Sequence, residues 1–296
     1  MKVLRKIERE FYRIKAQIFL PKEKRKEYVD GKIKKQEAAV FEKEAGKHLF
    51  GVSYSVFDGE ELLEKSVESI RSQVDYINVV WQDVSWKGAA GNKEVPILLE
   101  RLKSEGKIDE IIKFTPDISI KAARNEERKR NIGLEAAKKF GCDYFMTMDC
   151  DEFYLEDEVR EAKQFILKHG VTHSFCGFVN YGPLPTERFI DPSSYAVQFF
   201  SKINDKSYLG VEKGRNKNRI AEVDQTRELS DFAGAKYYFL THIHMHHMTL
   251  VRKDLYKKFM STSCADFKYV TKEQIDELLK KIGERTAVPN VFDIRI

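Results

Sequence analysis

Two acidic residues, separated by one position, follow an apolar run near the middle of the chain. Asp149 and Asp151 come directly after residues 144–148, whose apolar pattern is typical of a buried strand. Residues two apart on a strand point to the same face, so both carboxylates could meet one cation at the strand's end. Their hard oxygen atoms suit Mg²⁺ or Mn²⁺. We expect a metal site here, with a capped loop as the alternative.

Histidines cluster further along the chain, where four of the seven lie within residues 241–248. On a strand, His244 and His246 would share one face with His242, and His247 would lie on the opposite, mostly apolar face. A three-histidine zinc site is one interpretation. A single imidazole that completes the ligands of the Asp149/Asp151 ion is another, and strand periodicity favours His244 or His246 for it. Any one of these histidines could instead be a hydrogen-bonded structural residue.

Basic and acidic side chains near other predicted strand ends could contact a nucleotide. Arg124 and Arg130 lie on the predicted helix before the acidic pair, and guanidinium groups there could bind a diphosphate bidentately. A solvated helix face is the alternative. Asp83 follows a predicted strand, where its carboxylate could accept the imide N–H of a pyrimidine. A turn-forming aspartate is the alternative at that position.

Strands and helices alternate from residue 49 onward. The pattern predicts strands over residues 49–56, 76–81, 108–114 and 144–148, with helices between them, of which the last spans 122–140. Further strands are predicted at 172–180, 195–203 and 237–248, and a last helix from Thr271. This is an α/β pattern that predicts a mostly parallel central sheet between two helical layers. Ligands of such sheets bind at the carboxyl ends of the strands.

Composition and charge limit the possible classes of protein. The 296 residues are 42% apolar and 33% charged, which is typical of a globular chain, and no apolar run is long enough to span a bilayer. Four scattered cysteines without a C-x-x-C pair indicate reduced thiols in a cytoplasmic protein. The net charge is +5, but residues 1–47 carry +7 and the rest −2. An acidic body argues against a nucleic-acid-binding protein.

The basic N-terminal segment carries one apolar stripe, formed by Leu4, Ile7, Phe11, Ile14 and Ile18. This spacing predicts an amphipathic helix that ends near Pro21. Residues 1–20 could lie on anionic lipid as a peripheral membrane contact, or could dock on the protein's own domain or a second subunit. We expect three parts: a basic amphipathic helical extension at 1–47, an α/β domain at 48–258 and a C-terminal helical segment at 259–296.

Residues 49–258 resemble a glycosyltransferase of the GT-A fold, close to the family 2 type. The most specific stretch runs from Arg130-Asn131-Ile132-Gly133 to Asp149-Cys150-Asp151, which resembles the family's Arg-Asn-x-Gly helix, strand and D-x-D motif. Val52-Ser53-Tyr54 resembles its nucleotide-binding start, and Gln82-Asp83-Val84-Ser85 its Asp-Asp-Gly-Ser turn. The resemblance implies a GT-A (Rossmann-like) three-layer fold. It also implies that Ser53, Tyr54 and Asp83 contact the nucleotide, and that Asp149 and Asp151 hold a divalent ion on its diphosphate.

The resemblance also implies a later metal-binding histidine close before a basic residue, which favours His246 or His247. His246 therefore satisfies both the family pattern and the strand periodicity. Two departures are that Gln82 and Val84 replace the first Asp and the Gly of the turn. The Glu-Asp pair that supplies the base in inverting members, well after the D-x-D motif, is also missing. Of the later acids we favour Asp224 as the catalytic base over Glu187, Glu222 and Asp231.

The expected function is a metal-dependent glycosyltransferase that uses a nucleotide-sugar, most simply a UDP-sugar, with Mn²⁺ or Mg²⁺. The expected acceptor is a glycan or lipid-linked glycan in surface polysaccharide synthesis, at the cytoplasmic face of the membrane. A metal-dependent nucleotidyltransferase or phosphohydrolase is the alternative, since the same acids and histidines could serve it. No G-x-x-x-x-G-K-[ST] loop is present, which argues against a P-loop enzyme.

Overall fold

The computed structural model describes residues 48–189, 195–210, 220, 222–230, 233–261, 271–281 and 285–295. Residues Leu49–Ile296 form one compact unit. The expected N-terminal extension at 1–47, the expected membrane contact at 1–20 and Asp231 lie outside the described residues. Within the described part of the chain, no helix is long and apolar enough to cross a bilayer.

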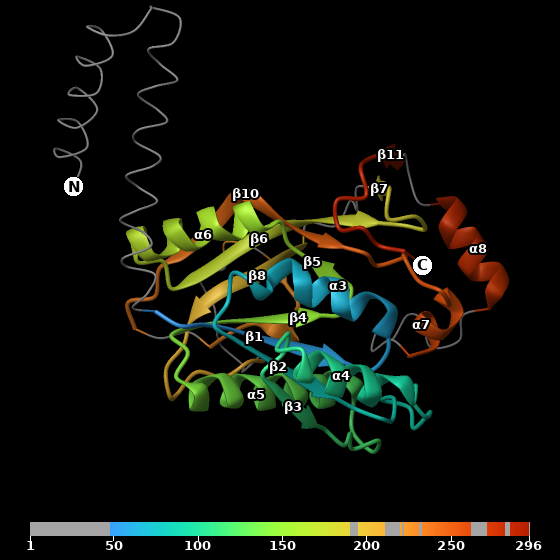
Figure 1. Ribbon diagram of the computed structural model, residues 1–296, viewed down its shortest axis with the longest axis horizontal. Coiled ribbons are helices and arrows are strands. Elements are labelled where there is room, and N and C mark those ends of the chain that lie inside the picture. The colour runs from blue at the N-terminus through green and yellow to red at the C-terminus, as the bar shows by residue number, and fades with distance from the viewer. Residues whose placement is uncertain are drawn as a thin grey trace, which may run out of the picture. The chain divides into compact units, whose positions relative to one another are not determined.

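Four parallel strands form the centre of the sheet (Figure 1). These are β1 (Phe50–Val56), β2 (Tyr76–Trp81), β3 (Glu110–Lys113) and β4 (Tyr144–Asp149), in the spatial order β4-β1-β2-β3. β1, β2 and β4 are almost wholly buried, because helices cover both faces of the sheet. Their carboxyl ends therefore meet at one edge, which carries Asp58, Gln82 and Asp149.

Beyond β4 the sheet is mixed. β8 (Tyr195–Lys202) runs antiparallel to β4, and β6 (His173–Tyr181) runs antiparallel to β8. β10 (Tyr237–His247) runs parallel to β6, and its end pairs with the two-residue β5 (Glu152–Phe153). The short strands β7 (Glu187–Phe189), β9 (Glu222–Val223) and β11 (Arg285–Ala287) were not predicted. The predicted α/β class with a parallel central sheet is confirmed.

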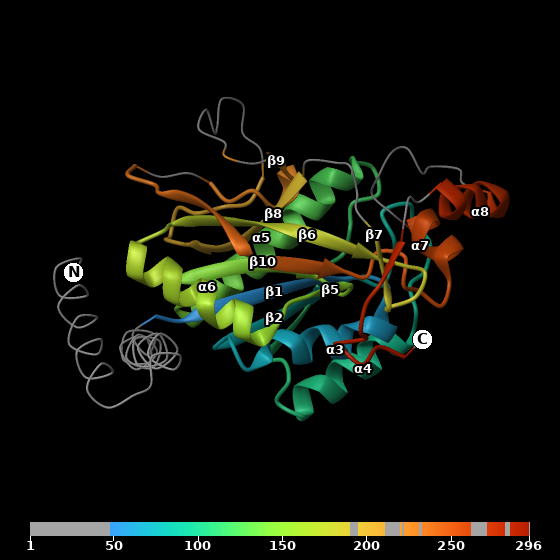
Figure 2. The ribbon, with the colours of Figure 1, turned by 90° about the horizontal axis from the view of Figure 1, so that it is seen from above.

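Helices cover the sheet on both sides (Figure 2). α3 (Glu60–Arg71), α4 (Glu94–Ser104) and α6 (Glu156–His169) pack on one face, and α5 (Ala122–Phe140) packs on the other. Alternate residues of β1 show this division: Val52 and Tyr54 belong to the core on the α3 side, whereas Gly51 and Ser53 face α5. The result is a three-layer, Rossmann-like arrangement.

The C-terminal part contains two helices, α7 (Leu255–Ser261) and α8 (Lys272–Lys281). It packs against the rest of the unit through apolar side chains. Phe259 and Ile275 share a cluster with Leu250, and the ring of Phe292 lies 4.9 Å from that of Phe153. α7 begins before the expected boundary at residue 258, so the end of the expected domain and the expected C-terminal segment share one helix.

A close approach of α5 to β1 fixes the position of the basic helix. A Cβ atom added at Gly133 would lie 1.8 Å from Ser53 Oγ and 3.0 Å from Asn78 Oδ1, so only glycine fits there. Ser53 Oγ itself donates to Asn78 Oδ1 at 2.7 Å, and Asn78 Nδ2 donates to the Gly133 carbonyl at 3.0 Å. This contact brings Arg130, about one helical turn earlier, to the end of β4.

Replacement of Gly133 by alanine tests this contact. We expect Gly133→Ala to lower the free energy of unfolding by about 2 kcal/mol or more, because the added methyl group overlaps the Ser53 hydroxyl. Urea denaturation measures the change. The double variant Ser53→Gly/Gly133→Ala is the matched control and should recover part of the loss. Equal stability of Gly133→Ala and the parent chain would contradict the described packing.

Candidate functional site

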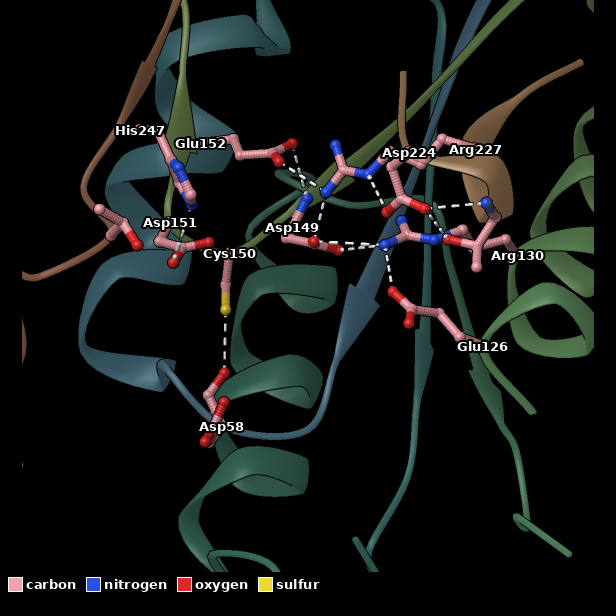
Figure 3. A network of polar contacts seen from close by, with 12 residues as sticks. Asp58, Glu126, Arg130, Asp149, Cys150, Asp151, Glu152, Asp224, Arg227 and His247 are labelled. Carbon is pink, nitrogen blue, oxygen red and sulfur yellow. Dashed lines mark hydrogen bonds and ion pairs between the residues drawn. The ribbon is translucent and has the colours of Figure 1, made fainter. Parts of the chain in front are cut away.

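The acidic pair lies at the carboxyl edge of the central strands, but only its first member belongs to a strand. β4 ends at Asp149, and Cys150 and Asp151 form a turn, so strand alternation does not apply to the pair. Cys150 Sγ lies 2.9 Å from the Asp58 carbonyl oxygen after β1. Figure 3 shows the carboxylates of Asp149 and Asp151 on opposite sides of Cys150. This corrects the geometric reason given for a shared cation, because each carboxylate has its own partners.

Asp149 is bound by two arginines. Arg130 Nη2 lies 3.2 Å from its Oδ1, and Arg227 Nη2 contacts its Oδ2. Both arginines have a second acid: Arg130 Nη2 lies 2.7 Å from Glu126 Oε1, and Arg227 Nη2 lies 2.6 Å from Glu152 Oε1. The arrangement is an alternating network of acids and guanidinium groups (Figure 3).

Burial and charge act in opposite directions on these acids. Burial alone would raise the pKa of Asp149, but Arg130 and Arg227 outweigh it and lower the pKa to about 2. Glu152 is buried, whereas Asp149 is partly exposed, and Glu152 accepts the Asp149 backbone N–H at 3.0 Å. Burial raises the pKa of Glu152 despite the attraction of Arg227. Of these two neighbouring carboxyls, Asp149 is therefore the stronger acid.

Asp151 is bound by a second set of cations. Arg252 Nη2 and Lys258 Nζ each lie 2.8 Å from its Oδ2, and His247 Nε2 lies 3.5 Å from the same atom. The Asp151 side chain is buried, which by itself would raise its pKa. Lys258, Arg252 and His247 reverse this effect and hold the pKa well below its usual range.

One of the three expected histidines reaches the acidic pair. Ile243 and Met245 of β10 are buried, and His247 follows them on the same alternating face, at the end where β10 pairs with β5. Met248 N–H donates to the Asp151 carbonyl at 2.8 Å, which holds this end of β10 beside Asp151. His247 thus lies on the mostly apolar face where strand periodicity placed it, although that periodicity favoured His244 or His246 beside the acids.

His246 and His244 have other surroundings. His246 Nδ1 lies 2.8 Å from the Tyr181 hydroxyl, its ring packs on Phe292, and burial lowers its pKa to about 4. His244 is exposed, and its backbone N–H donates to Glu158 Oε2 at 3.2 Å. Of the three histidines expected as metal ligands, His247 is therefore the one beside Asp151, whereas strand periodicity favoured His244 or His246.

Three other predicted residues fall into two groups. Ser53 and Tyr54 lie in the core, where the Tyr54 hydroxyl contacts Ser66 Oγ at 3.1 Å, so the expected nucleotide contacts at these two residues are corrected. β1 ends at Val56, as predicted, so its carboxyl end lies beyond both residues. Arg124 lies on the exposed face of α5 and pairs with Glu127 at 2.9 Å, which is the solvated helix face considered as its alternative.

Asp83 and Asp224 remain accessible at the site's edge. Asp83 is partly exposed at the end of β2 and pairs with Lys113 Nζ at 2.6 Å, which lowers the pKa of the carboxyl. Asp224 caps the short 3₁₀ helix η2 (Gln225–Arg227) by accepting the Thr226 N–H at 2.8 Å. Its Oδ2 lies 3.7 Å from Arg227 Nε, and its side chain is 49% exposed.

Three cations of the site were not predicted: Arg227, Arg252 and Lys258. Each contacts an acid from 78 to 107 residues earlier in the chain. No local spacing could have identified them. Arg252 was noted only as a basic residue after the histidines, and nothing marked it as a partner of Asp151.

A cavity of about 290 Å³ is lined in part by Arg252 and Lys258, the two cations that bind Asp151. Its wall is formed by the turn after β1 with the start of α3, by the segment before α4, and by the segment after β10 that carries Arg252 and Lys258. α3 begins after Gly59, whose left-handed backbone (φ 78°) serves as its N-cap without a side-chain hydrogen bond.

The donor chemistry of this edge fits a hard divalent ion. Asp149, Asp151 and His247 are the residues that would hold it, with carboxylate oxygen and imidazole nitrogen as ligands. In the described part of the chain, however, no three acidic, histidine or cysteine side chains are gathered as a ready metal site. The two aspartates hold cationic side chains instead, so an ion would have to replace at least some of them.

Comparisons with known proteins give weak likenesses. No family model and no curated protein matches the chain. Solved structures that match include residues 1–349 of S. aureus TarS, with 14% identity over 49% of this chain and 39% of that chain and a TM-score of 0.37. The same TarS fragment in complex with UDP-GlcNAc matches at 14% identity over 49% and 37% of the two chains, with a TM-score of 0.36.

A third match is a mannose-1-phosphate geranyltransferase from Thermus thermophilus, with 11% identity over 52% of this chain and 49% of that chain and a TM-score of 0.29. This chain thus spans about two fifths of the TarS fragment and half of the Thermus protein. Likenesses at these TM-scores establish neither a shared family nor a shared activity.

Removal of Arg227 tests the charge network. We expect Arg227→Met to lower the free energy of unfolding by about 3 kcal/mol at neutral pH, because Asp149 and Glu152 lose a shared, buried cation. Arg101→Met is the matched control. Arg101 pairs with Glu64 at the surface, so its loss should cost less than about 1 kcal/mol. Similar losses in both variants, measured by urea denaturation, would show that the network is not a structural unit.

Proposed function

We propose that this protein is a glycosyltransferase that transfers a sugar from a nucleotide-sugar to a hydroxyl group of a glycan or lipid-linked glycan. The observation that carries the proposal is the set of two acids and four cations at the carboxyl edge of β1 and β4. Asp149 and Asp151 lie there with Arg130, Arg227, Arg252 and Lys258. Open α/β sheets bind their ligands at this edge.

The four cations suit a diphosphate leaving group. Negative charge grows on the diphosphate as the bond to the sugar breaks, and fixed guanidinium and ammonium groups stabilise such charge. Arg130 and Arg227 are held by Asp149, and Arg252 and Lys258 by Asp151, so the acids keep the cations in place. A bound Mn²⁺ or Mg²⁺ would add Lewis-acid stabilisation of the leaving group, with Asp149, Asp151 and His247 as its ligands.

Asp83 and Asp224 are the candidate residues for contacts with the nucleoside and with the acceptor. Asp83, at the end of β2, has a carboxylate that could accept a pyrimidine imide N–H, which agrees with a UDP-sugar donor. Asp224, beside Arg227, is the proposed base that accepts the proton of the acceptor hydroxyl if the reaction inverts the anomeric centre. A role in surface polysaccharide synthesis at the cytoplasmic face of the membrane rests on the family resemblance of residues 49–258.

Loss of Asp151 tests the proposed site. We expect Asp151→Asn to lower turnover of the preferred UDP- or GDP-sugar by at least roughly 100-fold, because removing its charge releases Arg252 and Lys258 from their position. Product analysis with the full chain measures sugar transfer and donor hydrolysis, and thermal unfolding checks the fold. Asp157→Asn, an exposed aspartate paired with Arg160 on α6, is the matched control and should keep full turnover.

The result also separates the alternatives. Turnover that persists in Asp151→Asn and in the presence of a chelator would end both the proposed site and its metal dependence. Cleavage of a nucleoside triphosphate or a phosphoester, without transfer of a sugar, would indicate the nucleotidyltransferase or phosphohydrolase alternative.

Replacement of Asp224 by asparagine tests its proposed role as the base. We expect Asp224→Asn to reduce sugar transfer by roughly 100-fold or more, while binding of the nucleotide-sugar changes little, because the amide cannot accept a proton. Asp224 is about half exposed, so the fold should tolerate the change. Glu222→Gln, two residues earlier and also exposed, is the control. Loss of transfer in Glu222→Gln but not in Asp224→Asn would move the proposed base to Glu222.

A further inference from the structure

Arg252 and Lys258 occupy the oxygen atom of Asp151 that faces His247, the third proposed ligand of the ion. Both lie 2.8 Å from Asp151 Oδ2, and His247 Nε2 lies 3.5 Å from it. A divalent cation bound at this oxygen would lie beside two positive groups, and like charges repel strongly at such distances in a buried site. An ion that binds both this oxygen and His247 therefore requires that Arg252 and Lys258 move to another anion.

Arg252 has the donors that such an anion would use. Its side chain is 5% exposed, one nitrogen (Nη2) binds Asp151, and Nε and Nη1 have no hydrogen-bond partner. The guanidinium group packs on the bare Cα of Gly59, where an added Cβ would lie 3.0 Å from Arg252 Nη1. Two buried, unpartnered donors at the wall of the cavity are costly unless a ligand satisfies them.

The charge of the cavity wall indicates which ligand fits. The wall carries four basic residues and five acidic ones. The acids, which include Asp58 and Glu61 close to Arg252, disfavour a free diphosphate, and the basic residues disfavour a free cation. A diphosphate that carries a divalent ion presents both charges together and suits this mixed wall.

We propose that Arg252 and Lys258 are the diphosphate-binding residues of this chain, and that they transfer from Asp151 to the phosphates when the nucleotide enters. Asp151 becomes available to the ion only through this exchange, so ion and nucleotide bind as a coupled pair. This inference rests on the proposed function. By linkage, the nucleotide tightens ion binding by the same factor by which the ion tightens nucleotide binding.

The experiment measures binding of Mn²⁺ and of UDP to the full chain, each alone and in the presence of the other. Free Mn²⁺ is followed by its electron paramagnetic resonance signal, and UDP by calorimetry, with GDP as a second probe. In the parent chain we expect UDP to tighten Mn²⁺ binding at least about tenfold. In Lys258→Met and Arg252→Ala we expect Mn²⁺ alone to bind more tightly than in the parent, and the coupling to fall below roughly threefold.

Lys257→Ala is the matched control. Lys257 belongs to the same segment and to the cavity wall, but its backbone N–H rather than its side chain makes the described contact, with Asp254. It should keep the coupling of the parent chain. Lys258 is partly exposed, so Lys258→Met should fold even where Arg252→Ala does not, and thermal unfolding checks both.

The outcomes distinguish failure of the proposed exchange from failure of the proposed function. Coupling that is unchanged in Lys258→Met, while the parent chain binds UDP and turns over a UDP-sugar, would overturn the exchange and leave the proposed function intact. Coupling lost equally in Lys257→Ala would show a general charge effect and would also overturn it. A parent chain that binds neither UDP nor GDP, with or without Mn²⁺, would contradict the proposed function itself.

Discussion

Charge compensation of two acids, the partly buried Asp149 and the buried Asp151, is the constraint on which the candidate site depends. Asp149 and Asp151 lie at the end of the central strand of the sheet, where burial alone would keep a carboxyl neutral. Two cations on each side keep both acids ionised. Since the attraction must offset the cost of removing each ion from water, neither the acids nor the cations can be lost singly without penalty.

The fold supplies this compensation from segments that are distant in the sequence. Arg130 reaches Asp149 because α5 packs closely on β1 at Gly133, and Arg227 arrives from the 3₁₀ helix after β9. Arg252 and Lys258 follow the end of β10, which pairs with β5 next to Asp151. The acids lie at the end of a central parallel strand, whereas Arg227, Arg252 and Lys258 follow strands of the mixed half of the sheet. The two halves therefore depend on each other at this edge.

The local structure could be predicted from the sequence, whereas the contacts of the site could not. The apolar patterns gave β2 at 76–81 and α5 at 122–140 with their observed bounds, because each element is decided by its own burial and periodicity. The acidic pair was identified from the same kind of pattern, because it directly follows the apolar run of residues 144–148. The shared-face argument was wrong, however, because β4 ends at Asp149, and strand ends are set by the chain that packs around them.

The remaining differences have the same physical origin. His247, rather than His246, reaches Asp151 because the buried face of β10 is set by Ile243 and Met245, and its last position meets the acidic turn. The pattern placed His247 correctly on this face, but it could not show that the face reaches Asp151 at its end. The sequence predicted a nucleotide contact at Ser53. Its side chain packs against Gly133 instead, and this close contact explains why a small residue occupies the position.

A crystal structure of the full chain with Mn²⁺ and UDP tests the central claim most directly. The account predicts an anomalous manganese signal among Asp149, Asp151 and His247, with the diphosphate oxygens on Arg252 and Lys258. Manganese and nucleotide bound elsewhere, or a nucleotide at this edge with both cations still on Asp151, would contradict it.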